Sequence, residues 1–273
     1  MISPLRPIAL LLLLSGCTAV APVRWHSLGD PVTRGEISRR LSAPRVIFLG
    51  EFHDQRSHHD LQLKVIQLLE EKGEPIALGM EMFSVDSQTV LDHWVSGRLP
   101  LEDFIGVYRQ NWSIDWEEYG VIFRYARNHR IPIIGLNAPL DIVMKVSRSG
   151  WNSLSAAERG RLPVGVTPET TPEHRDFMSD AFASHGMDPD RFPFFVQAQG
   201  VRNSTMALRI QEALRTHPGR KLVVMTGMGH AVRGGIIQLL PPVIRAQTIV
   251  LFPYDDRMIG RIDPEDADIF IIE

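Results

Sequence analysis

The chain has 273 residues, 29 of them basic and 32 acidic, which gives a formal net charge of −3 at pH 7. Because no arginine run or basic patch is present, the composition argues against a nucleic-acid partner. The single cysteine excludes an intramolecular disulfide and a cysteine-based metal site. The length and the 22% of charged residues suit one large globular domain, or one domain with a helical insert.

Residues 1–16 have the pattern of a bacterial lipoprotein signal peptide. Arg6 precedes an apolar run too short to span a bilayer, and small residues then lead into Cys17 in the stretch "LSGC". We expect cleavage before Cys17 and its acylation; the alternative is an ordinary secretory signal. Loss of Arg6 leaves 28 basic against 32 acidic residues, a net charge of −4. Residues 17–39 then form a tether, and Thr18 at the second position favours an outer-membrane lipoprotein that faces the periplasm.

Six short apolar runs between residues 40 and 273 are expected to be strands. Most are nearly continuous in Val, Ile and Leu, which is typical of strands covered on both faces. The segments 61–71 and 117–130 between them have helical spacing. Strands that alternate with helices predict an α/β domain with a mostly parallel sheet flanked by helices. The predicted strands are 45–50, 76–82, 131–137, 221–227, 247–252 and 267–272.

The interval 140–216, between the third and fourth predicted strands, contains no good strand. Its first part is rich in turn residues, and helical patterns follow at 172–185 and 194–215. We interpret it as a helical insert that forms a lid or a partner-facing surface.

Polar side chains follow four consecutive predicted strands, at the carboxyl ends where α/β sheets bind ligands. Glu51 and His53 follow the first strand, Glu81 ends the second, Asn137 ends the third, and His230 follows the fourth. Taken singly, Glu51 and His53 fit a helix cap and Asn137 fits a turn. Together the four strand ends predict a site.

A second tier of polar residues lies on two predicted helices. His58, His59 and Gln62 share one face of the helix that follows the first strand, where the alternative is a solvated first turn. Gln199 lies in the later helix "FFVQAQGVRNSTMALRIQ", whose polar residues would line a cleft or its outer face.

These residue types suit two kinds of chemistry. Imidazole and carboxylate groups can hold a divalent metal that activates water, and Glu51 or Glu81 could then act as the catalytic base. Non-covalent haem needs only an axial Tyr, His or Met in an apolar pocket, and Tyr119 or Tyr108 could supply it. No G-x-S-x-G, G-x-x-x-x-G-K, H-E-x-x-H or C-x-x-C-H motif is present.

The motif series resembles the ChaN-like haem-binding lipoprotein family, within the wider Tiki/TraB group. The series is "LGEFHD…HHDLQ", "LGMEMF", "IPIIGLNAP", "AQGVRNSTMA", "VMTGMGH" and "DADIFIIE", in this order. The resemblance implies lipid anchoring, haem acquisition together with uptake machinery, and a homodimer that holds two stacked haems. It also implies that Gly50–His53, Gly227–His230 and Glu81 match the G-x-x-H motifs and glutamate that hold a metal in peptidase members. In the family's W-D-x-T-M-A helix, this chain instead carries Arg202, Asn203 and Ser204.

The leading hypothesis is therefore a lipid-anchored haem-binding protein of the bacterial cell envelope. The alternative is a metal-dependent hydrolase in which His53 and His230 are ligands. A third reading is a scaffold whose polar edge has only a structural role.

Overall fold

The computed structural model describes residues 25–27, 30–32, 34–184, 188–254, 256–258 and 262–271. The predicted signal peptide and Cys17 lie outside these residues. No helix in the described part of the chain is long and apolar enough to cross a bilayer.

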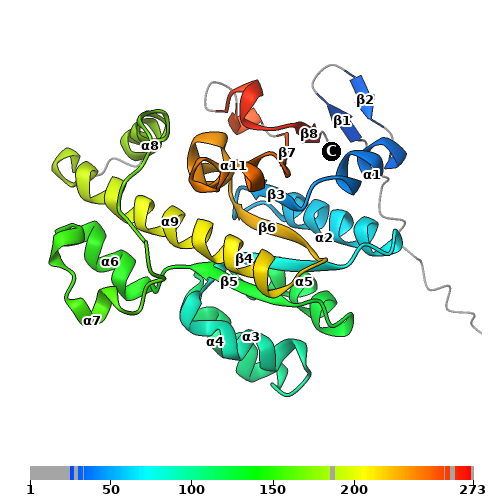
Figure 1. The fold of residues 1–273 in the computed structure, drawn as a ribbon, viewed down its shortest axis with the longest axis horizontal. Coiled ribbons are helices and arrows are strands. Elements are labelled where there is room, and N and C mark those ends of the chain that lie inside the picture. The colour runs from blue at the N-terminus through cyan, green and yellow to red at the C-terminus, as the bar shows by residue number, and fades with distance from the viewer. Residues whose placement is uncertain are drawn as a thin grey trace, which may run out of the picture.

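A six-stranded sheet forms the centre of the molecule, in the order β5-β4-β6-β3-β7-β8 (Figure 1). Its strand pairings are parallel, and all six predicted strands are present. The α/β prediction is confirmed. The strands are β3 (Val46–Glu51), β4 (Ile76–Ser84), β5 (Ile133–Asn137), β6 (Lys221–Gly227), β7 (Thr248–Pro253) and β8 (Ile269–Ile271), with a separate antiparallel pair β1 (Trp25–Ser27) and β2 (Asp30–Val32).

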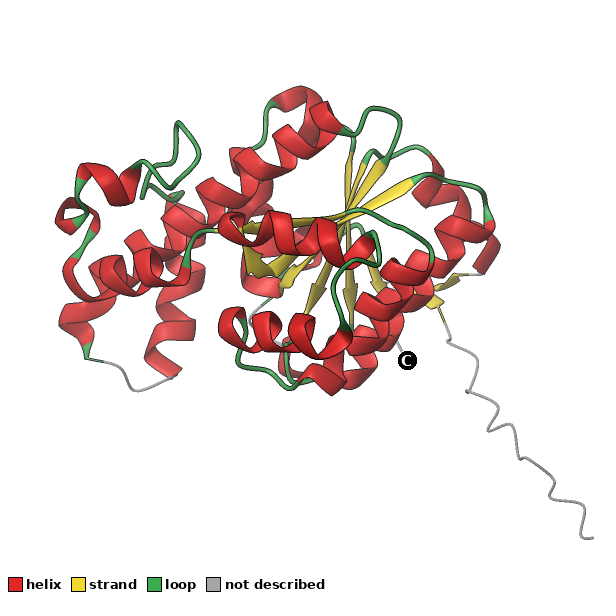
Figure 2. Cartoon of the chain, turned by 90° about the horizontal axis from the view of Figure 1, so that it is seen from below, coloured by secondary structure: helices red, strands yellow, loops and turns green. Residues whose placement is uncertain are grey.

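Helices cover both faces of the sheet, so side chains of alternate parity enter two different cores (Figure 2). In β3, Ile47 and Leu49 face one core, whereas Val46 and Phe48 face the other. The first face is covered by α1 (Arg34–Ser42), α2 (Arg56–Glu71), α3 (Gln88–Val95), α4 (Leu101–Asn111) and α5 (Trp116–Asn128). The second is covered by α9 (Phe192–Thr216), α10 (Met228–Ala231) and α11 (Pro242–Arg245).

Helix α1 (Arg34–Ser42) begins inside the stretch 17–39 that the sequence predicted to be a tether. Ile37 and Leu41 are fully buried on the first face of the sheet. The folded domain therefore begins before residue 40, because the apolar i, i+4 pair of α1 packs into the core.

The insert between β5 and β6 is helical, as predicted. It comprises α6 (Leu140–Ser149), α7 (Ala156–Arg159), α8 (Pro172–Ser184) and α9. The first three project to one side of the sheet (Figure 1). However, Met206 and Ile210 of α9 pack on the sheet itself, so this part of the insert belongs to the core rather than to a lid.

Neighbouring strands β3 and β6 mark the point where the connections diverge. The chain leaves β3 through α2 on the first face, and leaves β6 through α10 on the second. In parallel sheets such a divergence opens a crevice beyond the carboxyl ends of the two strands.

Candidate functional site

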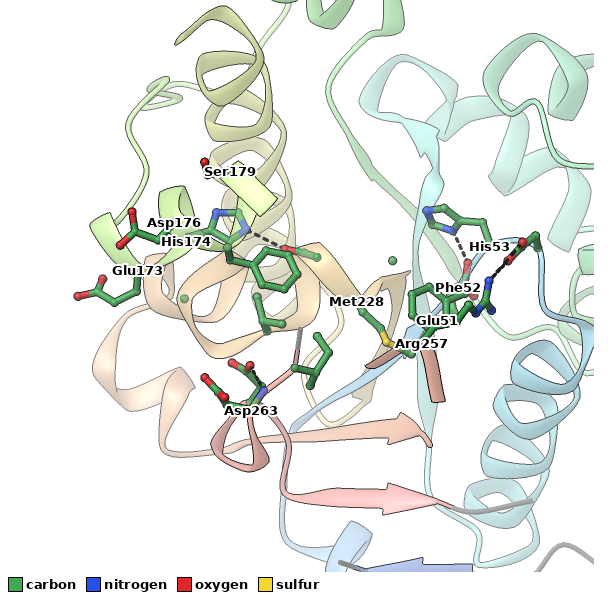
Figure 3. Close-up of a pocket in the computed structure, with 18 of the residues that line it drawn as sticks. Glu51, Phe52, His53, Glu173, His174, Asp176, Ser179, Met228, Arg257 and Asp263 are labelled. Carbon is green, nitrogen blue, oxygen red and sulfur yellow. Dashed lines mark hydrogen bonds and ion pairs between the residues drawn. The ribbon is translucent and has the colours of Figure 1, made fainter. Parts of the chain in front are cut away.

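A cavity of about 930 Å³ lies at this divergence. One wall is formed by Glu51, the last residue of β3, with Phe52 and His53 after it, and the opposite wall by α8, with Met228 of α10 between them (Figure 3). The volume is in the range of small-molecule and cofactor pockets. The lining also includes Asp54, Ile114, Glu173, His174, Asp176, Phe177, Gly227, Val232, Arg257, Ile262, Asp263 and Asp266.

His53 is the imidazole best placed to act in this cavity. Its Nδ1 lies 2.8 Å from Glu51 Oε1, while one third of its side chain is exposed. Trp112 packs edge-on against the ring, with 4.9 Å between centroids. Because a carboxylate accepts hydrogen bonds, Nδ1 carries the proton and Nε2 keeps its lone pair when the ring is neutral.

Glu51 is buried and held by several donors. Tyr119 Oη donates to Oε1, and Gln62 Nε2 donates to Oε2 at 2.6 Å. Burial alone would raise the pKa of Glu51, but the hydrogen bond from His53 and the charges of His53 and His59 outweigh it and lower the pKa. The same hydrogen bond raises the pKa of His53 against the opposing effect of burial. Glu51 is therefore a fixed anion that orients His53.

A second polar cluster surrounds Glu81, on the other face of the sheet. Arg202 of α9 forms an ion pair with Oε1, and the Gly227 amide donates to Oε2 at 2.7 Å. Burial alone would raise the pKa of Glu81, but the charges of His230, when protonated, and of Arg202 lower it to about 2. Burial lowers the pKa of His230 to about 3. At neutral pH, Arg202 therefore supplies the positive charge that Glu81 needs.

His230 belongs to a chain of hydrogen bonds that leads to the cavity. Its Nδ1 lies 2.5 Å from Asn203 Oδ1, and Asn203 Nδ2 lies 3.4 Å from His174 Nδ1. His174 Nε2 donates to the Gly229 carbonyl at 2.7 Å. Both ring nitrogens of His174 therefore have partners, although the residue lines the cavity.

The four predicted strand ends thus form two clusters rather than one. Glu51 shares the pleat parity of Ile47 and Leu49, whereas Glu81 faces α9. The clusters meet at Gly227, where an added Cβ would lie 2.8 Å from His53 Nε2 and 3.8 Å from Glu81 Oε2. Glu81 and His230 are not among the residues that line the cavity.

The second-tier residues have mainly supporting contacts. His58 Nδ1 accepts a hydrogen bond from the Phe52 amide at 3.0 Å, and His59 is fully buried beside Tyr119. Asn137 donates to the Glu81 carbonyl, and Gln199 accepts from Arg202. Of these groups, Gln62 supports the cavity wall through Glu51, and His58 supports it through Phe52.

Neither predicted tyrosine presents a free hydroxyl to the cavity. Tyr108 is fully buried and donates to the Ile114 carbonyl at 2.9 Å, and Tyr119 is fully buried and donates to Glu51. Burial and the nearby carboxylate of Glu51 raise the pKa of both phenols. Because an iron ligand of this type is a tyrosinate, the structure does not support either residue as the axial ligand.

A divalent metal also fits the described residues poorly. No group of three or more His, Cys, Asp or Glu side chains in this part of the chain is arranged to hold a metal ion. The carboxylate of Glu81 already binds Arg202, and Glu51 is surrounded by donors.

Sequence reasoning missed three residues at the site. Arg202 and His174 come from the insert, and Arg257 follows β7; Arg257 Nη1 lies 3.1 Å from Asp54 and its guanidinium lies 4.0 Å from the Phe52 ring centroid. The departure of "VRNS" from the family pattern was the signal for Arg202, but it did not reveal the ion pair with Glu81.

Comparison with known proteins gives one family match and several fold matches. The family model for haem-binding uptake proteins of the Tiki superfamily, ChaN, matches residues 37–240. The chain is 27% identical over 263 residues to protein RETICULATA-RELATED 5, chloroplastic, of Arabidopsis thaliana. This match covers 87% of the chain but only 34% of the plant protein, so the chain spans about a third of that relative's length.

Two solved structures share the fold over most of the chain. One is ChaN of Campylobacter jejuni with cofacial haem binding, which matches with a TM-score of 0.65 at 17% identity. The match covers 89% of this chain and 92% of that one. An erythromycin esterase mutant, EreC, in its open conformation has a TM-score of 0.51 at 12% identity, with 88% and 79% covered. At these identities the likeness shows a shared fold alone.

Proposed function

Because the chain belongs to the family of ChaN haem-binding uptake proteins in the Tiki superfamily, we propose that it binds haem in the cavity beyond β3 and β6. The observation that carries the proposal is His53, which lines this cavity while its Nδ1 is fixed by Glu51 and its Nε2 keeps a lone pair. Histidine ligands of metals commonly donate their second nitrogen to a carboxylate, which sets the tautomer and raises the basicity of the ligand. His53 is accordingly the proposed axial ligand of the haem iron.

The remaining walls suit a flat apolar ring with charged edges. Phe52, Phe177, Met228 and Val232 offer apolar surface around the cavity. Arg257 lies at its edge over Phe52 and provides a guanidinium that can bind a haem propionate. When bound, haem would supply the iron centre, and the residues of this chain would bind and orient it.

A haemin titration tests the proposal. The soluble chain that begins at residue 18 should give a saturable Soret shift, and His53→Ala should lower the affinity at least about tenfold. His129→Ala is the matched control, because His129 is an exposed histidine at the C-cap of α5 that pairs with Glu70 outside the cavity. An unsaturable titration of the unaltered chain would refute the function; equal affinity of the His53 variant would refute the ligand.

Membrane attachment is a separate proposal, supported by the sequence pattern that ends in "LSGC". Acylated Cys17 would anchor the domain in the outer membrane facing the periplasm, where it passes haem to uptake machinery. Two or more acyl chains give stable attachment, whereas one gives only marginal binding. Labelling with a clickable fatty acid, followed by membrane fractionation of the unaltered chain and of Cys17→Ala, tests it; a label that persists in the variant would contradict it.

A haem-dependent homodimer is the last part of the proposal. Cofacial haems, as described for ChaN of Campylobacter jejuni, need two iron ligands, and two copies of His53 would supply them. Light scattering with and without haemin should show the mass double as haem is added. A mass that stays monomeric at saturation would contradict this part alone.

A further inference from the structure

Glu81 and His230 are spaced like two ligands of one metal ion, but the positive charge that Glu81 binds is the guanidinium of Arg202. Glu81 Oε1 lies 3.4 Å from His230 Nε2. Two ligands that are each about 2.1 Å from a tetrahedral zinc ion are about 3.4 Å apart. Asn203 Oδ1 can only accept, so His230 Nδ1 donates to it and Nε2 carries the lone pair. This is the arrangement in which a histidine is fixed to bind a cation.

Arg202 already supplies a cation at this position. Its Nη2 binds the same carboxylate oxygen, Glu81 Oε1, that faces His230. Its Nε donates to Asn137 Oδ1 at 3.2 Å, and its Nη1 donates to Gln199 Oε1 at 3.4 Å. Acceptors on β4, β5 and α9 therefore fix the guanidinium, and only 17% of the side chain is exposed.

The charges of this cluster leave nothing for a second cation to neutralise. Glu81 and Arg202 sum to zero, and the positive guanidinium would repel a divalent ion at the same oxygen. The imidazole of His230 is neutral or positive, so it adds no negative charge to the cluster.

We propose that the guanidinium of Arg202 takes the place of a metal ion at the Glu81–His230 pair and excludes free divalent metals from this pair. This inference concerns the cluster on the α9 face and does not depend on haem binding in the cavity.

The test removes the guanidinium and offers metal in its place. We expect Arg202→Met to bind Co²⁺, Mn²⁺ or Zn²⁺ on the order of a hundredfold or more tighter than the unaltered chain. Binding is measured by isothermal titration, by the visible spectrum of bound Co²⁺, and by the metal-dependent rise in melting temperature. Arg202→Lys keeps the charge and should bind no metal; the double variant with Glu81→Gln removes the ligand and should bind none.

Each outcome decides the proposal. Metal uptake by Arg202→Met alone supports it, as does a variant that folds only when metal is added. Equal uptake by the unaltered chain overturns it, because the arginine would then exclude nothing. A variant that binds no metal, folded or unfolded, also overturns it, since the pair would then not be a cation site.

Discussion

At Gly227, the addition of one methyl group should weaken haem binding while the protein stays folded. The residue has φ −56° and ψ 146°, which any L residue adopts, so Gly227→Ala adds no backbone strain. Its Cβ would lie 2.8 Å from Nε2 and 2.9 Å from Cε1 of His53. Ordinary contact begins at 3.4 Å, so the ring must move by about 0.6 Å, the difference between 3.4 and 2.8 Å. That movement displaces the proposed iron ligand from its position beside Glu51.

The cost to stability should be small, because one third of the His53 side chain is exposed and water can replace a lengthened hydrogen bond. We expect the free energy of unfolding to fall by about 1 kcal/mol and haem affinity to fall at least about tenfold. Urea unfolding and haemin titration measure the two effects separately.

Gly106→Ala is the matched control for this substitution. Gly106 lies within α4, where an added Cβ meets nothing within 4 Å, so the same change should stabilise the helix by about 1 kcal/mol and leave haem affinity unchanged. Unchanged haem affinity in Gly227→Ala would refute the placement of the iron ligand. A loss of stability above about 3 kcal/mol would show instead that His53 is part of the fold.

Three further predictions follow from the buried groups. The folded-state pKa of Glu81 is about 2, below its ordinary 4.5, so its ionisation should contribute about 3 kcal/mol to stability above pH 4.5, and this contribution should be lost as the pH falls toward 2. In Glu81→Gln, urea unfolding should lack this pH dependence. The variant should also lose about 3–5 kcal/mol of stability at pH 7, because Arg202 remains buried without its anion. Tyr119→Phe should leave the Soret maximum of the haem complex unchanged, since the hydroxyl is bound to Glu51, and a shifted maximum would reinstate Tyr119 as a ligand. Ile37→Ala should cost about 2–5 kcal/mol by thermal or urea unfolding, because its side chain is fully buried, and a negligible cost would mean that α1 is indeed only a tether.

The sequence by itself determined the sheet strands, the α/β class and the family. Continuous runs such as "RVIFLG" and "KLVVMTG" are local signals, because a strand buried on both faces needs apolar side chains at successive positions. The polar residues after four strands were likewise visible. Helices α3 and α4 were not predicted, because their buried apolar sets are small: Leu91 and Trp94 in the first, and Phe104, Ile105 and Tyr108 in the second.

Tertiary structure decided how those residues are grouped. Pleat parity and the divergent connections of β3 and β6 place Glu51 and Glu81 on opposite faces, which strand-end position alone does not reveal. Arg202 reaches Glu81 across 121 positions of the chain. No local pattern encodes such a contact, because it depends on how α9 crosses the sheet. The sequence therefore indicated which residue types would meet, and packing determined that Glu81 would meet Arg202.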